Sequence, residues 1–222
     1  MNENFDSNQR EKDGVQEPRD RAEAELLRGV TEQLLKESEA REQELAKIEK
    51  EADLDHLTGL LNRRGFKKKL AEMREEGTTG ALLLLDIDRF KEINDAHGHT
   101  NGDLVLKAVA RHLKTICRES DLTVRWSGDE FILFFPDTTA DQILKKFTSE
   151  ASKKAAINVQ FTRRGEPETS KINITFSGGV VDLGLHADEN EAVGRADRTL
   201  YDVKDAGRNE IKVSRDESGE EK

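Results

Sequence analysis

The sequence predicts an α+β domain with a mostly antiparallel central sheet flanked by helices, preceded by a helical stalk. Three observations carry this prediction. Apolar runs of strand length alternate with segments of helical periodicity. The pair Ser127-Gly128 separates two of these runs, as in a β-hairpin. Residues 20–53 contain no Pro and abundant Glu, Ala, Leu and Lys, which favour helix.

The N-terminal third of the chain divides into two expected segments. Residues 1–18 are polar, and we expect disorder there. Residues 19–53 are predicted to form the stalk. Its apolar positions follow a 3-4 spacing in two groups, which are Leu27, Val30 and Leu34 and then Leu45, Ile48 and Ala52. A charged gap separates the groups, so the heptad pattern of a coiled coil is broken. The stalk is therefore either an amphipathic helix that rests on its own domain or a dimerising helix whose weak middle allows control by a partner.

The remaining elements belong to one predicted domain, residues 54–214, followed by a tail at 215–222 that we expect to be disordered. Asn62 is expected to open the first helix, Thr100 or Asn101 to cap the second, and Gly207 to end the last. The predicted helices are 63–75, 100–117, 141–156 and 189–205. The predicted strands are 80–86, 122–126, 131–135, 157–163, 172–182 and 211–213, with a polar turn at 165–168.

Composition limits the possible partners. The chain of 222 residues carries a net charge of -10, with 37% charged residues. Such acidity argues against a nucleic-acid polymer as partner, because phosphate backbones select basic surfaces. No apolar run approaches the roughly 20 residues of a membrane span, and no signal-peptide pattern opens the chain. The single cysteine, Cys117, cannot form an internal disulfide and is expected to be a small core residue. We therefore expect a cytoplasmic protein.

Four acidic residues stand where two predicted strands end or begin. Asp86 and Asp88 end the buried strand 80–86, and Asp129 and Glu130 follow the Ser127-Gly128 turn. If these strands are neighbours, the carboxylates converge at one end of the sheet. Carboxylate oxygens suit a divalent cation, so the pattern predicts a metal-assisted nucleotidyl-transfer site.

Four segments resemble the motifs of one family, the GGDEF-domain diguanylate cyclases, in the order in which that family has them. Residues 55–64 resemble DxLTGLxNRR, residues 86–103 resemble DxDxFKxxNDxxGHxxGD, residues 127–131 read SGDEF, and residues 201–209 resemble YxAKxxGRN. The resemblance covers about residues 54–213. It implies a palm-like GGDEF fold and a homodimer that condenses two GTP into cyclic di-GMP, with Mg²⁺ or Mn²⁺ as cofactor.

The resemblance also implies roles for individual residues. Metal ligands would be Asp86, the carbonyl of Ile87, and Asp129, which is also the family's proposed base toward the 3'-hydroxyl. Lys91 would stabilise the transition state on phosphate, and Glu130 and Asp88 would support the metal. Substrate contacts are expected from Phe90, Asn94, His99, Asp103, Gly128, Lys204 and Arg208. Asn94 and Asp103 suit guanine, because carboxylate and amide groups complement its donor and acceptor edge. Lys204 and Arg208 are four apart and are expected to share one face of the last helix.

Two departures from the family pattern concern activity and regulation. Ser127 replaces the first Gly of the motif. It costs about 1–2 kcal/mol if the position needs a left-handed backbone, but it fits position i+1 of a type II turn. Arg118 and Asp121 match the family's RxxD product-inhibition site. The second arginine of that site has no clear counterpart, and the stretch contains Lys145, Lys146, Lys153 and Lys154 instead. An alternative reading is a catalytically weak module that binds GTP or cyclic di-GMP and signals through a partner, and a regulatory protein acting on the stalk fits either reading.

Overall fold

The computed structural model describes residues 7–148, 157–162 and 169–215. It divides into two compact units, Met1–Glu51 and Ala52–Lys222. Within the described residues, none of the helices has both the length and the apolar character needed to cross a bilayer. The expected disorder of residues 1–6 and 216–222 lies outside the described part of the chain.

The first unit contains one long helix, α1 (Ser7–Ala52). It begins at Ser7, whereas we predicted disorder through residue 18 and a helix from residue 19. The polar composition of this segment suggested disorder because it offers little surface to bury. The same Gln, Arg, Glu and Lys residues are strong helix formers, and the structure follows that propensity. The apolar side chains of the stalk are exposed, with Leu27 at 60% and Leu34 at 60%.

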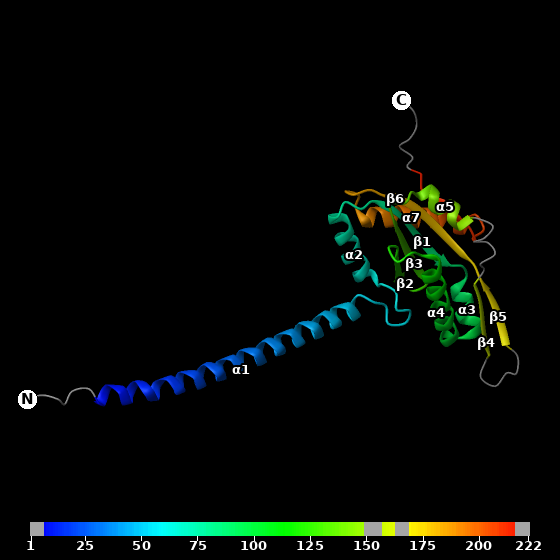
Figure 1. The fold of residues 1–222 in the computed structure, drawn as a ribbon. Coiled ribbons are helices and arrows are strands. Elements are labelled where there is room, and N and C mark those ends of the chain that lie inside the picture. The colour runs from blue at the N-terminus through cyan, green and yellow to red at the C-terminus, as the bar shows by residue number, and fades with distance from the viewer. Residues whose placement is uncertain (1–6, 149–156, 163–168, 216–222) are drawn as a thin grey trace, which may run out of the picture. The chain divides into compact units, whose positions relative to one another are not determined.

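The second unit is built on a five-stranded sheet with the order β2-β3-β1-β6-β7. The pairs β2–β3, β1–β3 and β1–β6 are antiparallel, and β6–β7 is parallel. The strands are β1 (Gly80–Ile87), β2 (Leu122–Ser127), β3 (Glu130–Pro136), β6 (Phe176–Leu183) and β7 (Ile211–Val213). This confirms the predicted α+β class with a mostly antiparallel sheet (Figure 1).

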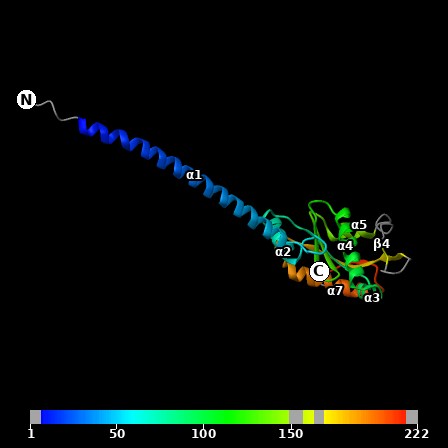
Figure 2. The ribbon, with the colours of Figure 1, turned by 90° about the horizontal axis from the view of Figure 1, so that it is seen from below.

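Helices cover both faces of this sheet. They are α2 (Arg63–Glu75), α3 (Phe90–His97), α4 (His99–Ile116), α5 (Ala140–Thr148) and α7 (Glu189–Asp205). Alternate residues of β1 enter two separate cores: Leu83 packs with α4, and Leu84 packs with α2 and α7. Figure 2 shows α4 and α7 on opposite sides of the strands. All eight residues of β1 are buried, so this central strand holds both layers together.

Helix boundaries follow the predicted caps in part. The side chain of Asn62 accepts a hydrogen bond from the Gly65 N–H at 2.9 Å, which confirms it as the cap of α2. The predicted cap of α4 is wrong. Gly98 precedes the helix without a side-chain cap, and the Asn101 amide donates instead to the His97 carbonyl at 2.8 Å. This bond ties the start of α4 back to α3, a separate short helix that the sequence pattern did not reveal.

The predicted strand 172–182 is two strands in two sheets. β5 (Thr169–Ile174) pairs with β4 (Ile157–Thr162) in a two-stranded sheet, whereas β6 joins the main sheet. The break falls at Thr175, whose hydroxyl donates to Asp88 at 2.7 Å and whose carbonyl accepts from the Asp88 N–H at 3.0 Å. These bonds hold Thr175 at the end of β1 and turn the chain from one sheet into the other. Residues 149–156 of the predicted helix 141–156, residue 163 of the predicted strand 157–163, and the predicted turn at 165–168 lie outside the described residues.

Candidate active site

The register of the sheet brings the motif carboxylates to one end of it. Asp86 pairs with Glu130 across β1–β3 and with Ser177 across β1–β6. Directly paired residues project on the same face, so the side chains of Asp86 and Glu130 are neighbours. Asp129 lies in the hairpin turn just before β3, and its carbonyl accepts from the Ile87 N–H at 3.4 Å. The predicted convergence of the two acidic segments is therefore present in the structure.

The carboxylates repel one another. Burial raises the pKa of Asp86 above its ordinary value, and the charges of Asp129 and Asp88 raise it further. Burial likewise raises the pKa of Glu130, with added repulsion from Asp86, Asp197 and Asp129. A cation placed among these groups would relieve the repulsion. The cation present there is Lys204, whose Nζ lies 2.8 Å from Oδ2 of Asp86 and whose charge lowers the pKa of both acids.

Lys204 and Arg208 do not share a helical face as predicted. Helix α7 ends at Asp205, and Gly207 follows with φ 127°. Arg208 and Asn209 then adopt positive φ values of 68° and 54°. This left-handed turn takes the exposed Arg208 off the helix, while Lys204 remains on the helix against the sheet. Spacing alone could not show where the helix ends.

Asp88 is occupied by protein hydrogen bonds. Its carboxylate accepts from the hydroxyls of Thr175 at 2.7 Å and Ser177 at 2.6 Å and from the Asn209 N–H at 3.1 Å. The residue is only 8% exposed. The contacts join the end of β1 to the start of β6 and to the turn after α7. Asp88 is thus better suited to holding the site together than to binding a metal.

The other expected substrate contacts lie on the two helices that follow β1. Arg89 precedes α3 with φ 57°, and Phe90 and Lys91 begin that helix. Asn94 lies against the start of α4, because Gly102 has no side chain: a Cβ there would collide with Asn94 Oδ1. Asp103, His99 and Lys91 are exposed. These polar residues lie on α3 and α4, the two helices that follow β1 in the chain (Figure 1).

The hairpin turn is held by an arginine that the sequence analysis did not single out. Arg125 donates from Nε and Nη2 to the carbonyl of Gly128, at 3.0 and 2.9 Å. Its Nη1 lies 3.2 Å from both carboxylate oxygens of Asp55. Gly128 has φ 42°, whereas Ser127 lies in β2 and its φ is not positive. Ser127 therefore needs no left-handed backbone, so of the two alternatives for this position the strained one does not apply.

A second polar region surrounds the RxxD segment. A pocket of about 410 Å³ is lined by Arg118, Asp121 and Lys146, among others. The Arg118 N–H donates to Asp121 Oδ2 at 2.8 Å. Lys146 lies 4.8 Å above the ring of Phe135. The lysine thus borders the pocket where the family pattern led us to expect an arginine.

The donor set at the acidic end fits a divalent cation. Asp86 and Asp129 offer carboxylate oxygens and Ile87 a backbone carbonyl, which are the hard ligands that Mg²⁺ and Mn²⁺ prefer. No metal-binding group of three or more His, Cys, Asp or Glu side chains occurs among the described residues. The expected set has two such side chains and a carbonyl, so it does not depend on a third.

Comparison with known proteins agrees with this geometry. The family described as "Diguanylate cyclase, GGDEF domain" matches residues 52–210. Diguanylate cyclase VdcA of Vibrio cholerae is 37% identical over 171 residues, which are 76% of this chain and 49% of that protein. Diguanylate cyclase DgcM of Escherichia coli is also 37% identical, over 74% of this chain and 39% of that protein. The chain thus spans about half or less of these curated relatives.

Solved structures extend the similarity to the N-terminal helix. The coiled coil and GGDEF domain of DgcB from Caulobacter crescentus, in complex with c-di-GMP, superposes with a TM-score of 0.69 at 30% identity. The match covers 86% of this chain and 98% of that one. Diguanylate cyclase SiaD from Pseudomonas aeruginosa, in complex with its activator SiaC, superposes with a TM-score of 0.67 at 30% identity, over 92% and 78% of the two chains.

Proposed function

We propose that this chain, which belongs to the GGDEF family of diguanylate cyclases, condenses two GTP into cyclic di-GMP and releases two pyrophosphates. The observation that carries the proposal is the acidic end of the sheet, where Asp86 lies opposite Glu130, next to the Asp129 turn, with Lys204 at 2.8 Å. A cytoplasmic location accompanies the proposal, because GTP is the substrate.

Asp86, Asp129 and the carbonyl of Ile87 would hold Mg²⁺ or Mn²⁺, which supplies Lewis-acid polarisation of the α-phosphate. Asp129 accepts the proton of the attacking 3'-hydroxyl. Lys204 is bound to Asp86 in the protein alone, so a triphosphate would offer its ammonium a second anionic partner. Glu130 adds negative charge beside Asp86, and Asp88 keeps the strand ends in place.

Groups on α3, α4 and the turn after α7 bind the phosphates and the guanine of GTP in this proposal. Lys91 and Arg208 are exposed cations suited to the leaving pyrophosphate. Asp103 accepts from the N1 and N2 hydrogens of guanine, and Asn94 pairs with its acceptor atoms. His99, the Phe90 segment and Gly128 complete the proposed substrate contacts.

The reaction needs two bound GTP molecules, and we assign one to each subunit of a homodimer. The exposed apolar residues of α1 provide the surface for pairing, with Leu27, Val30 and Leu34 near the middle of the helix and Leu45 and Ile48 near its C-terminal end. The SiaD–SiaC complex is the precedent for a regulatory protein acting on such a chain.

Cyclic di-GMP is also the proposed inhibitor. The pocket lined by Arg118, Asp121 and Lys146 offers cations for its phosphates and a carboxylate for its guanine. Lysine lacks the planar bidentate fork of arginine, so we expect weak inhibition. Arg118→Ala should abolish the inhibition and lower the affinity for cyclic di-GMP, whereas unchanged product binding would reject this assignment.

The direct test is incubation of the full chain with GTP and Mg²⁺ at high protein concentration, with chromatography for cyclic di-GMP. Asp129→Asn is the matched blank, because it preserves shape and removes the charge. Product from the wild type alone supports the cyclase and the role of Asp129. The assay is repeated with α1 replaced by a strong parallel coiled coil, which enforces dimerisation. If GTP binds but neither form makes product, the signalling module is favoured instead.

A further inference from the structure

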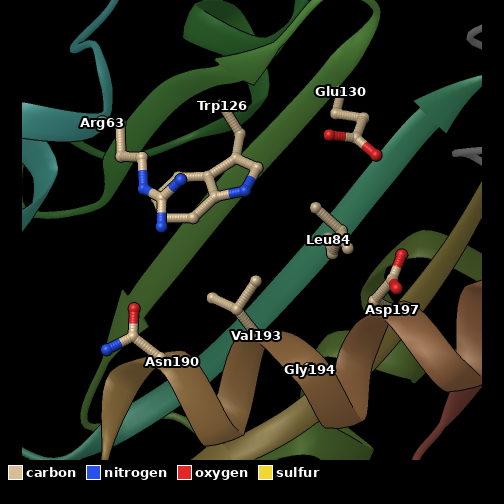
Figure 3. A pocket seen from close by; sticks show the side chains of 8 residues that line it. All are labelled: Arg63, Leu84, Trp126, Glu130, Asn190, Val193, Gly194 and Asp197. Atoms are coloured by element: carbon tan, nitrogen blue, oxygen red, sulfur yellow. The ribbon is translucent and has the colours of Figure 1, made fainter.

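A cavity separate from the RxxD pocket lies beside the catalytic carboxylates. Its volume is about 320 Å³, and its floor includes Leu84 of β1. Leu84 and Asp86 are two residues apart on one strand, so both side chains project on the face that α7 covers. Glu130 borders the cavity at one end (Figure 3). The proposed roles of the site residues leave this space unused.

One wall of the cavity is aromatic. The guanidinium of Arg63 lies over the Trp126 ring, 4.4 Å from its centroid. Phe66 packs edge-on against the same indole, with centroids 6.0 Å apart. In the part of the chain that the structure describes, the indole N–H has no hydrogen-bond acceptor. The wall thus offers a fixed aromatic ring, already in contact with one organic cation, and a free donor.

The opposite wall is a stripe of α7, formed by Asn190, Val193, Gly194 and Asp197 (Figure 3). These positions are spaced as one face of a helix. Gly194 keeps the wall open, because a Cβ built there would meet only the end of Arg198, at 3.9 Å. Val193 and the floor residue Leu84 make the middle of the cavity apolar.

The remaining end is acidic. Glu130 and Asp197 both border the cavity, and they repel each other. Neither carboxylate accepts a hydrogen bond or forms an ion pair within the described ranges. Arg63 is the one basic residue among those that line the cavity, so the lining has a net negative charge. Just outside it, Asp86 and Asp129 add negative charge, and Lys204 and Arg198 add positive charge. An anionic ligand is disfavoured here, and a cationic one is favoured.

We propose that this cavity binds a small aliphatic amine, with an ammonium group at Glu130 and Asp197 and its methylene chain over Leu84 and Val193. The Trp126 wall then packs against the methylene chain. This chemistry differs from that of GTP and cyclic di-GMP, which are anions. The proposed binding does not depend on cyclase activity, so it stands or falls separately from the proposed function.

Trp126 allows a direct test, because it is the only tryptophan in the chain. Its fluorescence would be followed while the full chain is titrated with putrescine at constant ionic strength and with chelator present, and calorimetry would be run in parallel. 1,4-Butanediol is the matched uncharged probe. We expect saturable binding of putrescine and none of the diol.

Two substitutions in the cavity test the location. Asp197→Asn removes one carboxylate and should weaken putrescine binding about tenfold or more, since a charge-assisted hydrogen bond contributes about 1.5–3 kcal/mol. Gly194→Leu fills the open part of the wall and should abolish binding, and helix propensity favours Leu over Gly at this site. Asp205→Asn, exposed on the same helix and outside the cavity, is the matched control and should bind as the wild type does.

Three results would overturn the proposal. One is the absence of binding by both methods up to millimolar putrescine. Another is equal affinity in the wild type, Asp197→Asn and Gly194→Leu, which would place the amine elsewhere. The last is an equal response to NaCl of matched ionic strength, which would mean general attraction to an acidic protein. Melting curves of each variant ensure that lost binding reflects the cavity and not unfolding.

Discussion

Arg125 and Asp55, 70 residues apart in sequence, form a bifurcated contact in which Nη1 of Arg125 lies 3.2 Å from each carboxylate oxygen of Asp55. The same guanidinium holds the carbonyl of Gly128, next to Asp129. Asp55 in turn accepts from the N–H and hydroxyl of Thr58, at 2.9 and 2.6 Å. The segment that follows α1 is thereby attached to the turn that carries the proposed base.

Arg125→Lys should destabilise the protein by about 1.5–3 kcal/mol, because lysine cannot donate to both partners in this planar arrangement. Turnover of GTP should fall at least tenfold, since the turn is no longer fixed. Urea denaturation and the cyclase assay measure the two effects. Arg111→Lys, at an exposed position of α4, is the control. If Arg125→Lys were as stable as the wild type, the contact would contribute nothing to the stability of the fold.

Asp55 should make stability depend on pH. Burial alone would raise its pKa, but hydrogen bonds from Thr58 and Arg125 and the charge of Arg125 hold the pKa below the ordinary value of 3.8. The ionised form is therefore the one that stabilises the fold. Its contribution is complete well above pH 3.8 and is lost as the pH falls through the lowered folded pKa. The stability difference between wild type and Asp55→Asn should shrink on acidification, and a constant or growing difference in urea denaturation would contradict this.

Asp88→Asn should cost about 1–3 kcal/mol of unfolding free energy. The carboxylate accepts from Thr175, Ser177 and Asn209, and an amide replaces one acceptor oxygen with a donor. At least one buried donor then loses its partner. Asp95→Asn, exposed on α3, should leave stability unchanged in the same denaturation experiment. Equal midpoints for the two variants would argue against the structural role of Asp88.

The two turn residues should respond differently to substitution. Ser127→Gly should leave turnover unchanged, because Ser127 has no positive φ. Gly128→Ala should lower the free energy of unfolding by about 1–2 kcal/mol. The cause is backbone strain at its φ of 42°, because an added Cβ would meet no other atom within 4 Å. Thermal melts and the cyclase assay compare the two. A faster Ser127→Gly enzyme would mean that the serine side chain hinders the substrate.

Lys204→Met should lower the melting temperature in chelator, because the raised pKa of Asp86 shows how poorly its buried charge is compensated even with the lysine present. Added Mg²⁺ should recover most of this loss if Asp86 is a metal ligand. Lys212→Met, which removes a surface ion pair with Glu210, is the control and should show neither effect. Failure of Mg²⁺ to stabilise Lys204→Met would count against the metal site.

The sequence alone determined the class of the fold and the location of the acidic site. The buried run that ends at Asp86, the turn before Asp129 and the cap at Asn62 are local patterns, and local backbone preference and hydrophobic period are readable from a single chain. The order of the four motifs also indicated the GGDEF family.

Tertiary structure decided what depends on distant partners. The break at Thr175 exists because Asp88 binds it from β1, and the departure of Arg208 from its expected face follows from the turn after α7. The Arg125–Asp55 contact and the cavity beside Trp126 join elements that sequence spacing does not relate. Periodicity shows which face of an element is buried, but only the packed chain shows which side chains meet across it.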